Sequence, residues 1–125
     1  MKKILSLLLA LVLFCAAFAS CSGAKGEYSC IHGDEASGSY ALETYTFSGD
    51  EVTKTIKVIL DKTTLSTESF RGTYSLIDKD GAQQIVFSLY DLKGAKSELH
   101  SFSASYIMAS DGSYVSIGGT IYNRK

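Results

Sequence analysis

The feature that most constrains this chain is an alternation of apolar and polar residues that recurs between turn signals from residue 27 to the end. It is clearest in residues 51–60, and a period of two belongs to a half-buried strand, because successive side chains of a strand point to opposite faces. No stretch of useful length has the period of an amphipathic helix. One face of residues 51–60 carries Val52, Ile56, Val58 and Leu60, with Lys54 as an exception.

Turn signals divide the chain into about seven strands joined by short connections. The sequences Ser48-Gly49-Asp50, Asp78-Lys79-Asp80-Gly81, Lys93-Gly94-Ala95-Lys96 and Asp111-Gly112 are typical of hairpin turns, and residues 33–38 are expected to form a loop. The predicted strands are residues 27–32, 40–48, 51–60, 70–77, 83–92, 98–109 and 113–123.

Short connections make neighbouring strands pair as an antiparallel, up-and-down meander, whose one apolar face must be covered. We therefore predict an all-β fold of about seven to eight strands that forms a small barrel or a strongly curled sheet, after an N-terminal signal helix. Its interior should be filled by large side chains. The predicted interior set is Ile56, Val58, Phe70, Tyr74, Ile85, Phe87, Phe102, Tyr106, Val115 and Ile117, and the predicted exposed set is Thr53, Thr55, Thr73, Ser101 and Ser103.

The first twenty-one residues have the order of a secretory signal: a basic start at Lys2 and Lys3, an apolar run over residues 4–19, and small residues before a cysteine. The apolar run is shorter than the 20 or so residues that a transmembrane helix needs. Phe18-Ala19-Ser20-Cys21 resembles the lipobox of bacterial lipoproteins, although Phe18 stands where an aliphatic residue is usual.

The lipobox resemblance implies cleavage after Ser20 and lipidation of Cys21, which would attach the protein to a membrane of the cell envelope. Ser22 in place of Asp then favours the outer membrane, if the envelope is Gram-negative. Residues 1–20 would be the signal peptide, residues 21–26 a tether and residues 27–125 the β domain. An ordinary cleaved signal and an uncleaved anchor remain as alternatives.

The charge of the mature chain excludes one class of partner. Without Lys2 and Lys3, the chain has ten basic and thirteen acidic residues, which gives a net charge of −3, and it contains no block of like charge. Nucleic-acid binding has no electrostatic basis in such a chain.

The three cysteines leave no obvious disulfide. Cys15 lies inside the apolar run and Cys21 carries the lipid in the lipobox interpretation, so Cys30 stands alone. It is either a redox-active or intermolecular thiol, or a small apolar residue of the first strand.

The β domain also resembles lipocalins and fatty-acid-binding proteins. Gly26-Glu27-Tyr28 is similar to the Gly-x-Trp that opens those chains, Gly72-Thr73-Tyr74 repeats the form, and Ile121-Tyr122-Asn123-Arg124 is similar to their closing segment. The resemblance implies that the first and last strands pair to close the barrel, that Arg124 lies over Tyr28, and that a small apolar molecule is bound.

Motifs for chemistry are few. His32-Gly33-Asp34-Glu35 offers metal-binding residue types but fits an ordinary loop, and the Asp78–Gly81 segment has Phe87 where a calcium loop needs Glu. No nucleophile motif, metal-spaced Cys/His pair or phosphate-binding glycine loop is present. We expect no enzyme activity, no cofactor and no metal.

The sequence thus predicts a lipid-anchored binding module for a small apolar ligand or a peptide, held at one open end of the domain. The competing hypothesis is a structural or protein-interaction lipoprotein with a filled core, whose partner is another envelope protein. An apolar pocket of about 300 Å³ or more would favour the ligand. The ligand-binding candidates are His100, Phe102, Tyr106 and Tyr74.

Overall fold

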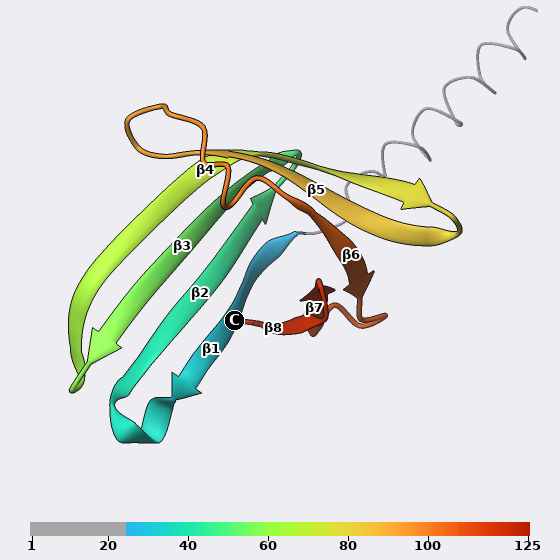
Figure 1. Ribbon diagram of the computed structural model, residues 1–125. Helices are drawn as coiled ribbons and strands as arrows, with labels where there is room; N and C mark the ends of the chain where they lie inside the picture. The colour runs from blue at the N-terminus through green and yellow to red at the C-terminus, as the bar shows by residue number, and fades with distance from the viewer. Residues whose placement is uncertain (1–24) are drawn as a thin grey trace, which may run out of the picture.

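The computed structural model describes residues 25–125, so the signal helix, Cys21 and most of the tether lie outside the described residues. The described part is built almost wholly of strands (Figure 1). Between residues 25 and 125, no helix is long and apolar enough to cross a membrane. The elements are β1 (Gly26–Asp34), the short 3₁₀ turn η1 (Glu35–Ser37), β2 (Ser39–Ser48), β3 (Glu51–Leu60), β4 (Thr63–Lys79), β5 (Ala82–Tyr90), β6 (Ser103–Met108), β7 (Tyr114–Ile117) and β8 (Thr120–Arg124).

The strands form a closed barrel in the order β1 to β8, and each strand is antiparallel to the next. Closure comes from β1 and β8, where Tyr28 pairs with Arg124 and Ser29 with Asn123. The predicted all-β meander is therefore confirmed. An eight-stranded antiparallel barrel is also compatible with a lipocalin-like fold.

The last predicted strand is in fact two strands. Gly118 and Gly119 both have positive φ, +61° and +87°, and form a two-residue hairpin turn between β7 and β8. A turn of this kind needs positive φ at both positions, which glycine adopts at no steric cost. The Gly-Gly signal was present in the sequence, and the prediction of one strand over residues 113–123 was wrong.

Two other strand boundaries differ from the prediction. β4 begins at Thr63 rather than near residue 70, directly after a tight turn at Asp61 and Lys62. The strand predicted from residue 98 begins only at Ser103. Before it the chain makes a turn in which the Ser101 amide donates to the Ser97 carbonyl at 3.0 Å. A local backbone hydrogen bond thus takes the place of a ladder bond there.

The core lies inside the closed barrel and is dominated by rings. Of the ten residues predicted to be interior, six are buried, while Ile56, Val58, Phe70 and Phe102 are only half-buried. Of the five predicted to be exposed, Thr73 and Ser103 are exposed, and Thr53, Thr55 and Ser101 are half-buried. The core cluster consists of Tyr28, Tyr45, Phe47, Val52, Tyr74, Ile85, Phe87, Leu89, Tyr106, Val115, Ile117 and Tyr122.

Burial at the end of β3 differs from the predicted alternation, and β4 carries a bulge opposite this end. The register between β3 and β4 shifts between Val58 and Ile59, so that Leu65 is an extra residue in β4. Beyond the shift Ile59 is 9% exposed and Leu60 is 50% exposed, the reverse of the predicted alternation. The extra residue is in β4, so the bulge changes the faces of β4 side chains, whereas β3 stays in unbroken register with β2, where Ile59 pairs with Tyr40.

The molecule has two regions, which we call the closed barrel and the open sheet. The open sheet consists of the halves of β1 to β4 that extend beyond the pairing with β8 and β5, namely residues 30–34, 39–43, 56–60 and 63–70 (Figure 1). β4 passes from one region to the other at Gly72, where an added Cβ would lie 1.9 Å from the Ser88 carbonyl oxygen. Only glycine permits this close approach of β5.

Candidate functional site

A groove lies where β1 and β8 separate. Their pairing ends after Ser29 and Asn123, and a groove of about 570 Å³ opens beside this point. Its volume falls in the range of small-molecule sites. We call it the β1–β8 groove; it is lined by Ser29, Cys30, Ile31, Glu35, Tyr40, Leu42, Ile121, Asn123, Arg124 and Lys125.

The β1–β8 groove is apolar in its middle and charged at its two ends. Tyr40 and Leu42 are half-buried in its wall. Ile31 and Ile121 are 41% and 45% exposed, far more than core residues of their type. Lys125 lies near the start of β1, where its amide donates to the Glu27 carbonyl at 3.0 Å, while Glu35 follows the end of β1.

A group of polar side chains, which we call the Glu43 cluster, ties the strands together behind this groove. Glu43 Oε1 accepts a hydrogen bond from the Tyr122 hydroxyl at 2.9 Å and lies 3.2 Å from Lys54 Nζ. Glu43 Oε2 lies 2.9 Å from His32 Nε2. Because these partners come from β1, β3 and β8, one carboxylate on β2 holds both sides of the separation between β1 and β8.

The environment of Glu43 favours its charged form. Burial alone would raise the pKa of this carboxyl, but the Lys54 ammonium and the hydrogen bonds from Tyr122, Lys54 and His32 outweigh it and lower the pKa. Burial, with the Glu43 charge, raises the pKa of Tyr122. The cluster therefore combines a carboxylate with one neutral phenol donor, Tyr122.

Lys54, the exception in the alternation of residues 51–60, is the most unusual member of this cluster. Its side chain is 6% exposed, and Nζ lies 5.0 Å from the ring centre of Tyr45 and 5.3 Å from that of Phe102. Such contacts place a cation over ring faces, where the quadrupole is negative. The alternation in the sequence already placed Lys54 on the inward face. It did not predict the acidic partner, Glu43, that such a buried lysine needs.

The four predicted ligand residues lie away from the β1–β8 groove. Tyr74 and Tyr106 are buried in the core, at 6% and 3% exposure. Phe102 covers Lys54, and the His100 ring lies 4.2 Å from the Phe70 ring, with the pKa of His100 lowered by burial and by Lys54. None of the four lines the β1–β8 groove.

The predicted closure residues are neighbours in the barrel. Arg124 lies opposite Tyr28 in the β1–β8 register. Its guanidinium is directed to Gly26 and Gly112, where added Cβ atoms would be 3.6 Å and 3.4 Å from its nitrogens. Among residues 25–125, the cation–π contacts belong to Lys54, and a contact of Arg124 with the Tyr28 ring stays a prediction.

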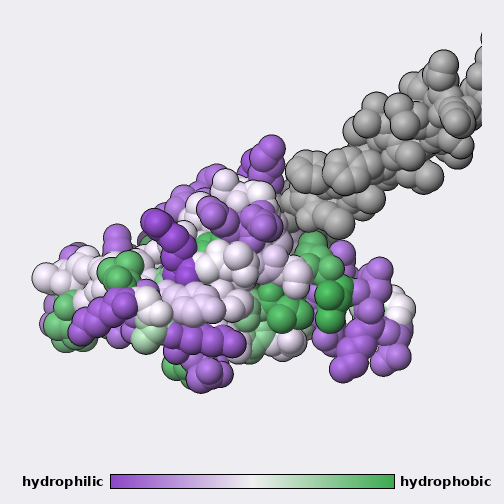
Figure 2. All heavy atoms as spheres, turned by 90° about the horizontal axis from the view of Figure 1, so that it is seen from above, coloured by the Kyte–Doolittle hydropathy of each residue, from purple (hydrophilic) through white to green (hydrophobic). Residues whose placement is uncertain are grey.

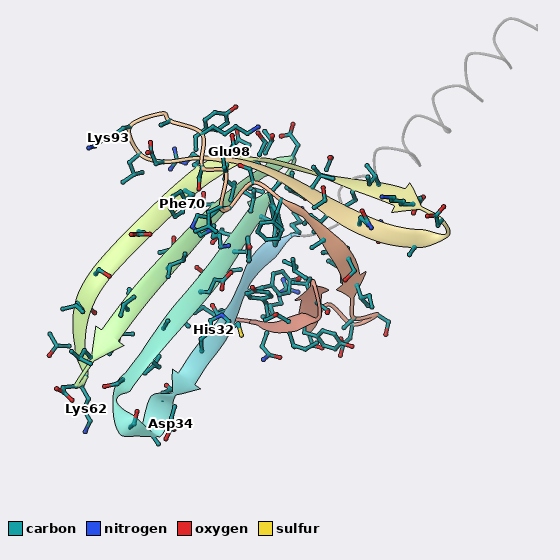
Figure 3. The ribbon with its side chains drawn as sticks, in the orientation of Figure 1. His32, Asp34, Lys62, Phe70, Lys93 and Glu98 are labelled. Carbon is teal, nitrogen blue, oxygen red and sulfur yellow. The ribbon has the colours of Figure 1, made fainter. Side chains whose placement is uncertain are left out.

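A second groove, of about 380 Å³, lies between β4 and the connection that follows β5. Its walls are residues 67–70 on one side and Asp91, Leu92 and Lys93 on the other. Figure 3 shows Phe70 on β4 below this connection, with Lys93 at its outer turn. We call it the β4-edge groove, because β5 pairs with β4 only from Arg71 onward.

Apolar side chains also remain exposed outside the β1–β8 groove. Leu92 and Leu99 are 82% and 81% exposed. Seen from above, the surface is mostly hydrophilic, with hydrophobic residues in separate patches (Figure 2).

The residues considered for metal binding have other partners. His32 bonds to Glu43, and Asp34 caps η1 by accepting from the Ala36 amide at 3.0 Å. Within the described residues no group of three or more His, Cys, Asp or Glu side chains is placed to hold a metal ion. Cys30 is a free, half-buried thiol, and burial, with the Glu43 charge, raises its pKa.

Comparison with known proteins found no family model, no curated protein and no solved structure that matches this chain.

Proposed function

We propose that this protein is a lipid-anchored lipoprotein of the cell envelope that binds a small amphiphilic ligand in the β1–β8 groove. The observation that carries the proposal is the groove itself, an apolar trough of about 570 Å³ with basic residues at one end. An apolar chain in contact with Tyr40, Leu42 and Ile121 would gain about 25 cal/mol for each square ångström buried. An anionic head group would lie toward Lys125.

The position of the groove explains why a filled barrel can still bind. Core rings fill the interior, with Tyr45 and Phe87 stacked at 5.1 Å between centres. The proposed binding surface is therefore on the outside, where the pairing of β1 with β8 stops. The Glu43 cluster stabilises this arrangement, because Tyr122 and His32 hold β8 and β1 to the same carboxylate.

The fluorescent anion anilinonaphthalene sulfonate is a suitable probe. We expect Ile31→Asp and Ile121→Asp each to weaken its binding about tenfold, because a carboxylate replaces apolar surface and repels the probe. Ile107→Asp is the matched control, since Ile107 is 61% exposed on β6 and outside the groove. Equal binding by all three variants and the unmodified protein would refute the assignment of the groove.

The competing proposal is a structural or protein-interaction lipoprotein without a ligand. It is supported by the filled core and by the exposed edges of the open sheet. Native mass spectrometry of protein extracted from membranes in mild detergent distinguishes the two. A bound molecule of constant mass supports the ligand proposal. If no such molecule is found and the unmodified protein does not bind the fluorescent probe, the structural or protein-interaction proposal is supported.

Lipid attachment is tested separately. We expect intact-mass analysis to show an acylated Cys21 after cleavage at Ser20, and Cys21→Ala to release the protein into the aqueous phase. One myristoyl-length chain binds only marginally and several bind firmly, so the partition should be nearly complete. Ser22→Ala is the control. Retention of Cys21→Ala in the detergent phase would contradict the lipobox interpretation.

A further inference from the structure

The first half of β4 is an open strand edge. Residues 63–70 pair with β3 on one side, and β5 begins to pair with β4 only at Arg71, opposite Tyr90. No other strand of residues 25–125 pairs with this half of β4, which forms the left rim of the sheet in Figure 1. Such an edge presents backbone N–H and C=O groups that another strand can pair with.

The regular part of this edge is residues 66–70. The bulge at Leu65 interrupts the lower end, because Val58 pairs with Ser66 while Ile59 pairs with Thr64. Bulges are one device by which proteins protect sheet edges, and proline or lysine are others. Residues 66–70 contain no bulge, proline or lysine, and the inward-facing Glu68 is their one charge.

The β4-edge groove runs beside this same stretch. Residues 67–70 form one wall and Asp91, Leu92 and Lys93 form the other, and residues 66–68 are exposed. Leu92 is 82% exposed, so the groove offers an apolar contact beside the unpaired backbone. Asp91 is already engaged, since its Oδ1 accepts from the amides of Lys93 and Ala95 at 2.9 Å.

Charge decides which strand fits. Glu68 is the central residue of 66–70, so antiparallel pairing of two copies about this centre would set Glu68 against Glu68, and like charges directly opposite are destabilising. A strand with Lys or Arg at that position would gain a cross-strand pair. Its neighbours would lie opposite Thr67 and Ser69, which favours threonine or another β-branched residue.

We propose that residues 66–70 accept an extended segment of a partner polypeptide as an added antiparallel strand, with a basic residue of that segment opposite Glu68. This inference does not rest on the proposed function, because it concerns another groove and another kind of ligand. Main-chain hydrogen bonds would supply most of the affinity and the Glu68 pair the selectivity.

The probe is an acetylated, amidated pentapeptide of sequence Ile-Thr-Lys-Thr-Thr, compared with Ile-Thr-Glu-Thr-Thr. We expect the lysine peptide to shift the amide NMR signals of residues 66–70 and to bind about two- to fivefold more tightly than the glutamate peptide. In Glu68→Lys the preference should reverse. Glu51→Lys, an exposed acidic-to-basic change on β3 instead of β4, should leave the preference unchanged.

Three results would overturn the proposal: no shifts at residues 66–70 with either peptide at millimolar concentration, equal affinity for both peptides, or an unchanged preference in Glu68→Lys. Concentration-dependent shifts at these residues without peptide would assign the edge to a second copy instead, and would also overturn it. Glu68 is exposed, so both charge variants should fold, which the retained spectrum of the closed barrel would verify.

Discussion

The closed barrel and the open sheet share the strands β1 to β4 but differ in how far their inward side chains are buried. In the closed barrel, β1 to β4 face β5 to β8 across a ring-filled interior, and Tyr45, Ile85 and Leu89 are fully buried. In the open sheet the inward faces of the same strands carry Ile56, Val58 and Glu68, which are half-buried or exposed. The difference teaches that the buried packing lies in one region, while the free strand edges and the grooves lie at and beyond its border.

The largest test of this comparison removes one apolar side chain from each region. Phe87→Ala should lower the free energy of unfolding by about 3–5 kcal/mol, because it leaves a cavity among stacked rings. Val58→Ala, in the open sheet, should cost about 1 kcal/mol, because little surface leaves water there. Urea unfolding measures both, and comparable losses would mean that the open sheet is as tightly packed as the barrel.

A smaller effect is expected at the border between the regions, where Lys54 lies. Lys54→Met should cost about 3 kcal/mol at neutral pH, because the Glu43 carboxylate loses its buried partner. Because the pKa of Glu43 is lowered in the folded state, its contribution is present above the ordinary value of about 4.3 and is lost as the pH falls through the lower folded value. The cost of Lys54→Met should therefore shrink in acid.

The double variant Glu43→Leu with Lys54→Met is the control for that prediction. Replacing both partners by apolar residues is often neutral, so it should recover most of the lost stability. A double variant as unstable as Lys54→Met would show that the cluster contributes through shape rather than charge.

The smallest test concerns hydroxyls inside the barrel. The Tyr106 hydroxyl is buried without a hydrogen-bond partner among the described residues, whereas the Tyr74 hydroxyl donates to the Gly49 carbonyl at 2.7 Å. Tyr106→Phe should raise stability by about 1 kcal/mol and Tyr74→Phe should lower it by about as much. Thermal unfolding ranks the two, and destabilisation by Tyr106→Phe would indicate an ordered water at its hydroxyl.

The sequence by itself determined the strand class, most turns and the direction of most side chains. Alternation and turn residues act over a few positions, so Val52, Phe87 and Val115 could be placed inside from the chain alone. The Gly118-Gly119 turn is encoded by two adjacent residues in the same way, although the prediction treated residues 113–123 as one strand.

Only the tertiary structure decided where the barrel closes and where it stays open. The partner of Lys54 is eleven residues away on β2, and Tyr122 reaches Glu43 from the other end of the chain. Whether an edge is paired depends on the lengths and registers of strands distant in sequence, as at Ser29 with Asn123 and at Arg71 with Tyr90. The β1–β8 groove and the β4-edge groove exist because those pairings stop, and no local pattern of residues encodes where they stop.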